Sequence, residues 1–178
     1  HLFYDHLIFC LHNHAFFFIL VFLVDWLPES VEGVVARPSF WQRLWRKNGH
    51  DDVRPVVGFA GIWLMVDEAH IVSVGVRDRY RRSGIGEMLL IAAIEQAMIR
   101  EAGVVTLEVR SSNRPAINLY RKYGFSERGV RKSYYADNRE DALIMTTEPI
   151  QHPDYREFFL KLEREHRRRW GAAERTVA

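Results

Sequence analysis

The sequence predicts one α/β domain, built on a mixed, mostly antiparallel sheet flanked by helices. The chain has 178 residues, of which 48% are apolar and 27% charged, so it can bury one sizeable core. Short apolar runs are interspersed with segments whose apolar side chains recur at helical spacing, which is typical of strands combined with helices. We expect the domain to cover residues 1–150, and an amphipathic helix with a frayed tail to cover residues 151–178.

The first 55 residues contribute least to this prediction. The chain does not open with Met, so we expect its N-terminal part to be incomplete. The apolar run from Ala15 to Val24 is about half of the roughly 20 residues that span a bilayer, so we interpret it as a buried strand and expect no membrane anchor. Residues 25–55 then form an irregular insertion with prolines, glycines and mixed charge.

Regular elements follow from Val56. Two apolar runs joined by a tight turn at Asp67 to Ala69 favour an antiparallel hairpin. The expected elements are strands at 56–66 and 69–76, a helix at about 84–102, a strand at 103–110, a short helix within 111–124, two strands within 125–149 and a helix at 154–170.

The two later helices carry more detailed signals. For the short helix, Asn113 is the expected N-cap, Pro115 lies in the first turn, and Gly124 follows the last turn. For the last helix, the apolar face is predicted to consist of Tyr155, Phe158, Phe159 and Leu162.

Charge and cysteine content narrow the class of protein. The formal net charge of +2 is too small to imply nucleic-acid binding, and the basic run "EREHRRRW" is interpreted as a solvated helix end. The single cysteine, Cys10, excludes an internal disulfide framework and favours a reducing compartment, so we expect a cytoplasmic protein. His12 and His14 lack a third ligand nearby, and we predict no metal.

The stretch "YRRSGIGEMLL", from Tyr80 to Leu90, lies where a strand gives way to a helix. Successive backbone N–H groups in such a glycine turn, with the helix dipole behind them, form a cradle for a phosphate. Gly84 and Gly86 lack a β-carbon, so the backbone can approach an anion closely. The glycines are equally consistent with a tight turn alone. Their spacing matches neither of the two common nucleotide-binding loops.

The pattern Arg81-x-x-Gly84-x-Gly86 after a strand resembles the acetyl-CoA pyrophosphate loop of the GCN5-related N-acetyltransferase (GNAT) family. The segments "YRRSGIGEMLL", "TLEVRSSNRPAINLYRKYGF" and "RKSYYADNREDALIM", in this order, are similar to the bacterial ribosomal-protein alanine N-acetyltransferases of that family. The resemblance covers about Val56 to Met145 and implies a GNAT fold.

The resemblance also implies which residues hold the cofactor. The strand before the loop would pair with the pantetheine arm, the loop amides would meet the pyrophosphate, and Asn113 would reach the cofactor from the next helix. The implied residues are Val74, Gly75, Val76, Arg81, Arg82, Ser83, Gly84, Ile85, Gly86, Glu87 and Asn113. Gly75 independently suggests a bulge or a close backbone approach, although a packing need would also explain it. Asn113 as a plain N-cap needs no ligand.

The resemblance makes Glu108 the general base and Tyr120 the general acid, and it places Tyr134 and Tyr135 on the peptide substrate. A carboxylate inside the strand "TLEVR" is unusual in its own right. A salt bridge from Glu108 to Arg110 is the alternative, but adjacent strand residues point to opposite faces. Tyr120 could also be a core aromatic, and Tyr134 and Tyr135 ordinary strand aromatics.

The resemblance implies acetyl transfer from acetyl-CoA to a protein N-terminal amine, such as the N-terminal alanine of a ribosomal protein. An ammonium cannot attack a thioester, so a base is required. An acetyltransferase for lysine or a small amine is one alternative, and an acetyl-CoA-binding module without turnover is another. The sequence leaves the acceptor and the oligomeric state open.

Overall fold

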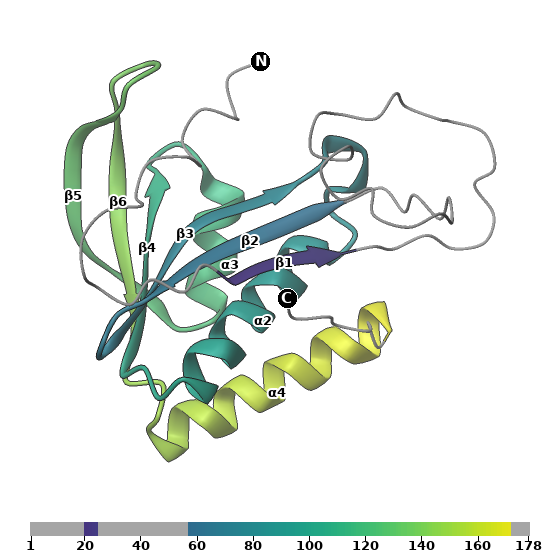
Figure 1. The fold of residues 1–178 in the computed structure, drawn as a ribbon. Helices are drawn as coiled ribbons and strands as arrows, with labels where there is room; N and C mark the ends of the chain where they lie inside the picture. The colour runs from purple at the N-terminus through teal and green to yellow at the C-terminus, as the bar shows by residue number, and fades with distance from the viewer. Residues whose placement is uncertain (1–19, 25–56, 172–178) are drawn as a thin grey trace, which may run out of the picture.

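One mixed sheet of six strands organises residues 20–24 and 57–171, the part of the chain that the structure, a computed structural model, describes (Figure 1). The strand order is β1-β2-β3-β4-β6-β5. Only β3 and β4 are parallel, and every other neighbouring pair is antiparallel. The strands are β1 (Leu20–Val24), β2 (Gly58–Leu64), β3 (Glu68–Val76), β4 (Val104–Arg110), β5 (Phe125–Tyr135) and β6 (Glu140–Thr147). The predicted fold class is confirmed.

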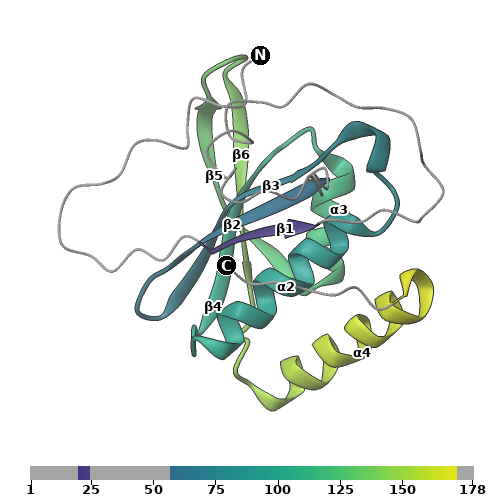
Figure 2. The ribbon, with the colours of Figure 1, turned by 45° about the vertical axis from the view of Figure 1, so that its right-hand side comes forward.

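Three α-helices accompany the sheet in the described residues. They are α2 (Ile85–Ile99), α3 (Arg114–Lys122) and α4 (Pro153–Trp170), and a short 3-10 helix, η1 (Asp78–Tyr80), precedes α2. Helix α2 contacts β2 and β3, and α4 lies against α2 on the side away from the sheet (Figures 1 and 2). Helix α2 is buried along most of its length because it lies between these two layers. None of the described helices is both long and apolar enough to span a membrane.

The two central strands, β3 and β4, run together only briefly. Their parallel pairing extends from Glu68 opposite Val104 to Ile71 opposite Leu107 and then stops, although both strands continue. At the same point the register between β2 and β3 shifts, which leaves Val72 as an extra residue on β3. A bulge bends a strand and increases its local twist, so it accounts for the divergence of β3 from β4.

The expected hairpin between β2 and β3 is confirmed, but its turn lies earlier than predicted. The Met65 N–H donates to the Glu68 carbonyl at 2.8 Å, and Glu68 and Ala69 already belong to β3. Helix α2 is likewise shorter than predicted, because Glu101 adopts a left-handed φ of 61° that ends the helix.

Helix α3 begins and ends where its capping residues predict. The Asn113 side chain accepts from the Ala116 N–H at 3.3 Å, Pro115 lies in the first turn, and Gly124 adopts a left-handed φ of 81° after the last turn. Because each signal is local to the backbone, the sequence alone is enough to identify all three.

The apolar face predicted for α4 is wrong at Phe158, whose exposed fraction is 40%. Tyr155, Phe159 and Leu162 are buried as expected, and the buried face continues through Glu163 and His166. These positions recur every three or four residues, so they form one stripe, whereas Phe158 lies at its margin. The stripe therefore carries polar groups into the contact between α4 and the rest of the domain.

Several predictions fall on residues outside the described ranges. Of the expected strand from Ala15 to Val24, the structure describes β1, which pairs with β2. Cys10, His12, His14, the insertion at 25–55 and the tail after Gly171 lie outside the described residues.

Candidate active site

The glycine loop between β3 and α2 contains two residues in the left-handed region, Arg82 at φ 63° and Gly84 at φ 82°. The Ser83 hydroxyl donates to the Tyr80 carbonyl at 2.5 Å, and Arg81 forms an ion pair with Asp78 at 2.7 Å. Because the first N–H groups of a helix have no partner within it, the α2 amides at this end are available to an anion. The loop therefore has the backbone geometry of an anion cradle.

A carboxylate, Glu87, lies in the first turn of α2, where it could repel an anion. Lys122 forms an ion pair with it at 2.6 Å, and the Tyr123 hydroxyl donates to the same oxygen at 2.8 Å. Burial acts to raise the pKa of Glu87, but the hydrogen bonds from Lys122 and Tyr123 outweigh burial and lower it. The negative charge of Glu87 is thus offset by Lys122.

Gly75, in contrast, is not the bulge of β3, which lies at Val72. Gly75 pairs with Phe59 of β2, and a β-carbon on Gly75 would lie only 2.6 Å from the Phe59 ring. Packing against an aromatic ring is therefore enough to require glycine here. Val74, Gly75 and Val76 nevertheless lie in the part of β3 beyond its pairing with β4. In an antiparallel ladder alternate residues direct backbone groups away from the partner strand, so some of these groups face away from β2.

Glu108 lies on β4, one residue after the last residue paired with β3. Its side chain is only 8% exposed and makes two charged contacts. One carboxylate oxygen lies 2.7 Å from His70 Nε2 on β3, and the other lies 3.0 Å from Arg131 Nε on β5. Glu108 is therefore held from both sides in the region where β3 and β4 separate.

Arg110, the alternative partner that the sequence offered for Glu108, points elsewhere. It pairs with Asp137 at 3.0 Å and with Glu140 at 3.3 Å. These hydrogen bonds raise the pKa of Arg110 and outweigh desolvation, which acts to lower it. The expectation that Glu108 and Arg110 do not pair is consistent with this arrangement.

His70 is the residue at this site that the sequence interpretation missed. It lies opposite Thr106 in the parallel register, so it shares a sheet face with Thr106 and Glu108. The available signal was a pair of polar residues, His70 and Glu108, each inside an otherwise apolar strand. Their contact could not be inferred without the register of β3 against β4.

Tyr120, on α3, is partly buried and packs against Phe125, with ring centroids 5.7 Å apart. Burial, with a smaller contribution from Tyr135, raises the pKa of Tyr120 to about 12. The phenol therefore stays protonated at neutral pH. Its aromatic packing is that of the core residue considered as the alternative, and a protonated hydroxyl is also able to donate a proton.

Tyr134 and Tyr135 end β5, with their rings edge to face at 5.3 Å. The Arg110 guanidinium lies 3.9 Å from the Tyr135 ring centroid. Burial is the main cause that raises the pKa of Tyr135, and the Glu108 carboxylate adds to it. The Arg131 guanidinium, which pairs with Glu108, lies 5.6 Å from the Tyr134 ring centroid, so the structure brings Glu108 and the end of β5 into one region.

Glu140 braces the segment between β4 and α3. One of its oxygens accepts from the Ser112 N–H at 2.8 Å and from the Ser111 hydroxyl at 3.3 Å. The hydrogen bonds from Ser112 are the main cause that lowers the pKa of Glu140, to about 2, with further contributions from Asn138 and Arg110. Asn113, next along this segment, is exposed and caps α3 as described above. No group of three potential metal ligands lies within the described residues.

The divergence of β3 from β4, the glycine loop before α2 and the enclosed carboxylate lie in one domain, whose class, the transferases that take an acyl group from coenzyme A, follows from its family. The sequence profile of the acetyltransferase (GNAT) family matches residues 11–125, and the chain belongs to this family. It is accordingly an acetyl-CoA-dependent acyltransferase.

Three similar proteins show which acetyltransferases of the family the chain is most like in sequence among those compared below. A Bacillus subtilis protein assigned to alanine N-acetylation of ribosomal protein bS18 is 43% identical over 125 residues, which cover 70% of this chain and 80% of that protein. The Escherichia coli [ribosomal protein bS18]-alanine N-acetyltransferase is 40% identical over 92 residues, 51% of this chain and 62% of that enzyme. An N-alpha-acetyltransferase of Sulfurisphaera tokodaii is 50% identical over 82 residues, 46% of this chain and 48% of the relative.

Among solved structures, the ribosomal-protein-S18-alanine N-acetyltransferase from Escherichia coli has a TM-score of 0.52 at 37% identity, over 58% of this chain and 66% of that chain. A nourseothricin acetyltransferase has a TM-score of 0.50 at 32% identity, over 54% of this chain and 59% of that chain. Because these two enzymes act on different acceptors, the shared fold does not by itself define the acceptor.

Proposed function

We propose that this protein acetylates the N-terminal α-amine of a protein, with the N-terminal alanine of a ribosomal protein as its acceptor. The observation that carries the proposal is Glu108, enclosed by His70 and Arg131 where β3 and β4 separate. The similarity to bacterial alanine N-acetyltransferases and to an archaeal N-alpha-acetyltransferase supports this acceptor class. A ribosomal acceptor would place the reaction in the cytoplasm.

The described residues fit an acetyl-CoA substrate. At Gly86 an added β-carbon would contact only Val76, at 3.7 Å, so the first turn of α2 is open on that side. We assign the pyrophosphate to the amides of Arg82 to Glu87 and the pantetheine arm to Val74, Gly75 and Val76. Arg81 adds positive charge, and Asn113 lies at the start of α3. Acetyl-CoA supplies a thioester, an acyl group activated for attack by an amine.

The first task of the site is to deprotonate the acceptor. An N-terminal ammonium has a pKa near 8 and is mostly protonated at neutral pH, so it cannot attack the thioester. A carboxylate has about four acceptor positions, and His70 and Arg131 occupy two of them. Glu108 can therefore still accept a proton from the amine, directly or through one water.

His70 orients this base. Its Nε2 lies 2.7 Å from one oxygen of Glu108, and its Nδ1 lies 3.8 Å from Glu68. With a proton on Nε2, the imidazole donates to the Glu108 carboxylate and holds it in place for the acceptor amine. We assign to His70 the role of a positioning residue for Glu108.

The remaining steps use the backbone and Tyr120. A backbone amide of residues 74–76 would donate to the oxyanion that forms when the amine attacks the thioester carbonyl. Tyr120, a phenol that is protonated at neutral pH, would donate its hydroxyl proton to the departing thiolate. No covalent enzyme intermediate is required. Tyr134 and Tyr135, at the end of β5, would contact the acceptor peptide.

A peptide panel tests the proposal. The protein is incubated with acetyl-CoA and peptides that begin with alanine, and mass spectrometry locates the acetyl group. The matched control peptides have the same sequence with a blocked N-terminus and a free internal lysine. We expect acetylation of the free N-terminus only. Acetylation confined to lysine would assign the protein to side-chain acetylation, and coenzyme A binding without any product would make it a binding module.

A further inference from the structure

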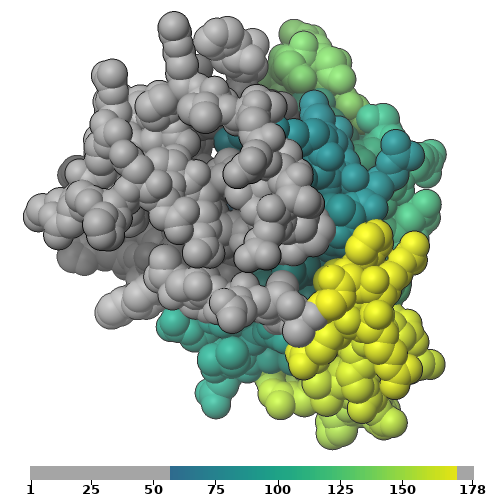
Figure 3. Space-filling view, turned by 90° about the vertical axis from the view of Figure 1, so that its right-hand side faces the viewer, coloured from purple at the N-terminus to yellow at the C-terminus, as the bar shows by residue number. Residues whose placement is uncertain are grey.

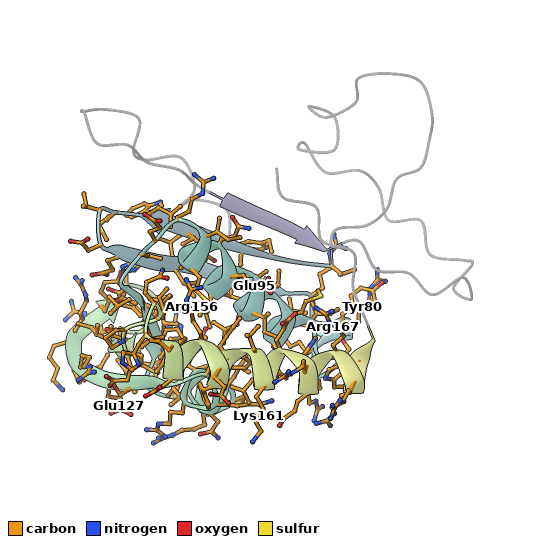
Figure 4. The ribbon with its side chains drawn as sticks, turned by 90° about the horizontal axis from the view of Figure 1, so that it is seen from below. Tyr80, Glu95, Glu127, Arg156, Lys161 and Arg167 are labelled. Atoms are coloured by element: carbon orange, nitrogen blue, oxygen red, sulfur yellow. The ribbon has the colours of Figure 1, made fainter. Side chains whose placement is uncertain are left out.

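The last turn of α4 contacts the glycine loop that precedes α2, although about 80 residues separate the two in sequence. His166 Nε2 lies 3.0 Å from the Gly84 carbonyl oxygen. A β-carbon on Gly84 would lie 2.7 Å from the Trp170 ring, so the indole lies directly on this glycine. Figure 3 shows the yellow end of α4 in contact with the teal part of the chain. In Figure 4, Arg167 of α4 and Tyr80, just before the loop, lie at the same end of the molecule.

In the hydrogen bond between His166 and Gly84, the imidazole is the donor. A carbonyl oxygen only accepts, so the imidazole must carry its proton on Nε2 and donate it to Gly84. The same carbonyl also accepts the first hydrogen bond of α2, from the Met88 N–H at 2.9 Å. Two donors from two different helices therefore hold one peptide group.

The orientation of that peptide group determines where the next amide points. The described residues contain no cis peptide bond, and in a trans peptide the C=O and the N–H point in opposite directions. Because the Gly84 carbonyl points along α2 towards Met88 and His166, the Ile85 N–H points out of the N-terminus of α2. This N–H is among the amides assigned above to the pyrophosphate.

Other contacts of α4 hold His166 and Trp170 against the glycine loop. His166 has an exposed fraction of only 9%, and Arg167 forms an ion pair with Glu163 one turn earlier. The Arg169 guanidinium lies 5.0 Å from the Trp170 ring centroid. At the other end of α4, the Tyr155 hydroxyl donates to the Tyr123 carbonyl at 2.8 Å. Helix α4 thus makes side-chain hydrogen bonds to the rest of the domain near both of its ends.

We propose that α4 is part of the cofactor site, with His166 as a positioning residue that aims the Ile85 amide at the pyrophosphate of acetyl-CoA and Trp170 closing the loop from the outside. The inference rests on the proposed assignment of the pyrophosphate to this loop. The sequence pattern alone does not suggest it, since the basic run at 163–170 is interpreted there as a solvated helix end.

The test compares three substitutions of one side chain. His166→Leu removes the donor, His166→Gln keeps an amide donor near the position of Nε2, and His166→Asn carries the same amide on a shorter side chain that does not reach Gly84. Coenzyme A binding is measured by calorimetry. A lost hydrogen bond of ordinary strength predicts a dissociation constant about 3- to 10-fold higher for the Leu and Asn variants. The Gln variant should bind as the wild-type protein does.

Tyr155→Phe is the matched control. It removes another hydrogen bond from an α4 side chain to a backbone carbonyl, about three helical turns from His166. It should lower thermal stability to a similar extent and leave the dissociation constant of coenzyme A unchanged. A second comparison uses S-acetylpantetheine, which lacks the pyrophosphate. With S-acetylpantetheine as the acyl donor, His166→Asn should have the same kcat/KM as the wild-type protein. With acetyl-CoA, its kcat/KM should be about 3- to 10-fold lower than that of the wild-type protein.

The outcomes separate this inference from the proposed function. If Gly84→Asp abolishes binding of coenzyme A but folded His166→Asn binds it as the wild-type protein does, the loop assignment stands and the role of His166 is refuted. If the wild-type protein does not bind coenzyme A, the loop assignment and the role of His166 are both refuted. If His166→Leu does not fold, the Asn and Gln pair decides, because both keep a polar side chain at the buried position.

Discussion

Glu108→Gln is the substitution that separates a catalyst from a binding module. Glutamine keeps the size of the side chain but cannot accept a proton from the acceptor amine. General base catalysis contributes about 10²- to 10⁴-fold, so we expect turnover to fall by that factor, with coenzyme A affinity nearly unchanged.

The cost in stability can be worked from the contacts of Glu108. Its two partners are His70, which is 18% exposed, and Arg131, which is 53% exposed, so solvent weakens the second ion pair considerably. The glutamine oxygen can still accept from Arg131, and its amide can donate to His70 if the imidazole changes tautomer. We therefore expect a loss of about 1 kcal/mol, or a melting temperature lower by about 2–4 °C.

The assay is steady-state kinetics across pH, with thermal melts and coenzyme A calorimetry on the same preparations. Glu148→Gln is the matched control, because this carboxylate is 67% exposed and pairs with Arg128 far from the site. It should leave both rate and stability nearly unchanged. Wild-type turnover in folded Glu108→Gln would refute the assignment of the base and leave only the cofactor site.

Three further substitutions test other parts of the site. Gly84→Asp adds a negative charge and a side chain at a left-handed φ, against Trp170, so coenzyme A affinity should fall at least tenfold; unchanged affinity by calorimetry in a folded variant would remove the loop from the site. Tyr120→Phe should lower kcat by about 10²-fold or more with little change in melting temperature, and because the Tyr120 pKa is about 12, no loss of wild-type rate below about pH 10 should come from this phenol; a silent substitution would make it a core aromatic only. Glu140→Gln tests how the stability of the fold depends on pH. In the folded protein the pKa of Glu140 is lowered to about 2 from the ordinary 4.5, so the unfolded chain takes up the proton first as the pH falls. The stabilisation by the Glu140 carboxylate is therefore present above pH 4.5 and is lost as the pH falls towards 2. The difference in urea stability between wild type and Glu140→Gln should shrink from about pH 6 to 3, and a constant difference would contradict this account.

The sequence predicted best those features that depend on neighbouring residues. The caps of α3 were identified because Asn113 and Gly124 act on the backbone within a turn of their own positions. The hairpin of β2 and β3 was identified for the same reason, although its turn was placed too late. Local patterns also identified the glycine loop, since Gly84 adopts the left-handed φ that favours this residue.

The features that the sequence did not predict depend on register between distant segments. The contact of His70 with Glu108 needs four residues of parallel pairing to be known. The hydrogen bond from His166 to Gly84 needs the path of α4. Gly75 suggested a bulge or a close backbone approach, with a packing need as the alternative. Its contact with Phe59 fits the packing alternative, and the bulge lies at Val72, which no residue preference marks. The roles of Glu108 and Tyr120 in catalysis stay predictions.

The outer strand β5 has a consequence for how the molecule behaves in a crowded solution. Within the described residues β5 pairs only with β6, so one of its backbone edges could accept a strand from another chain. Two irregularities of register, between Glu127 and Gly129 and between Arg131 and Tyr135, interrupt that edge, and Ser133 adopts a left-handed φ of 51°. A neighbouring strand would also have to desolvate the exposed charged side chains of β5. Within the described residues, these features make the outer edge of β5 a poor template for pairing with another chain.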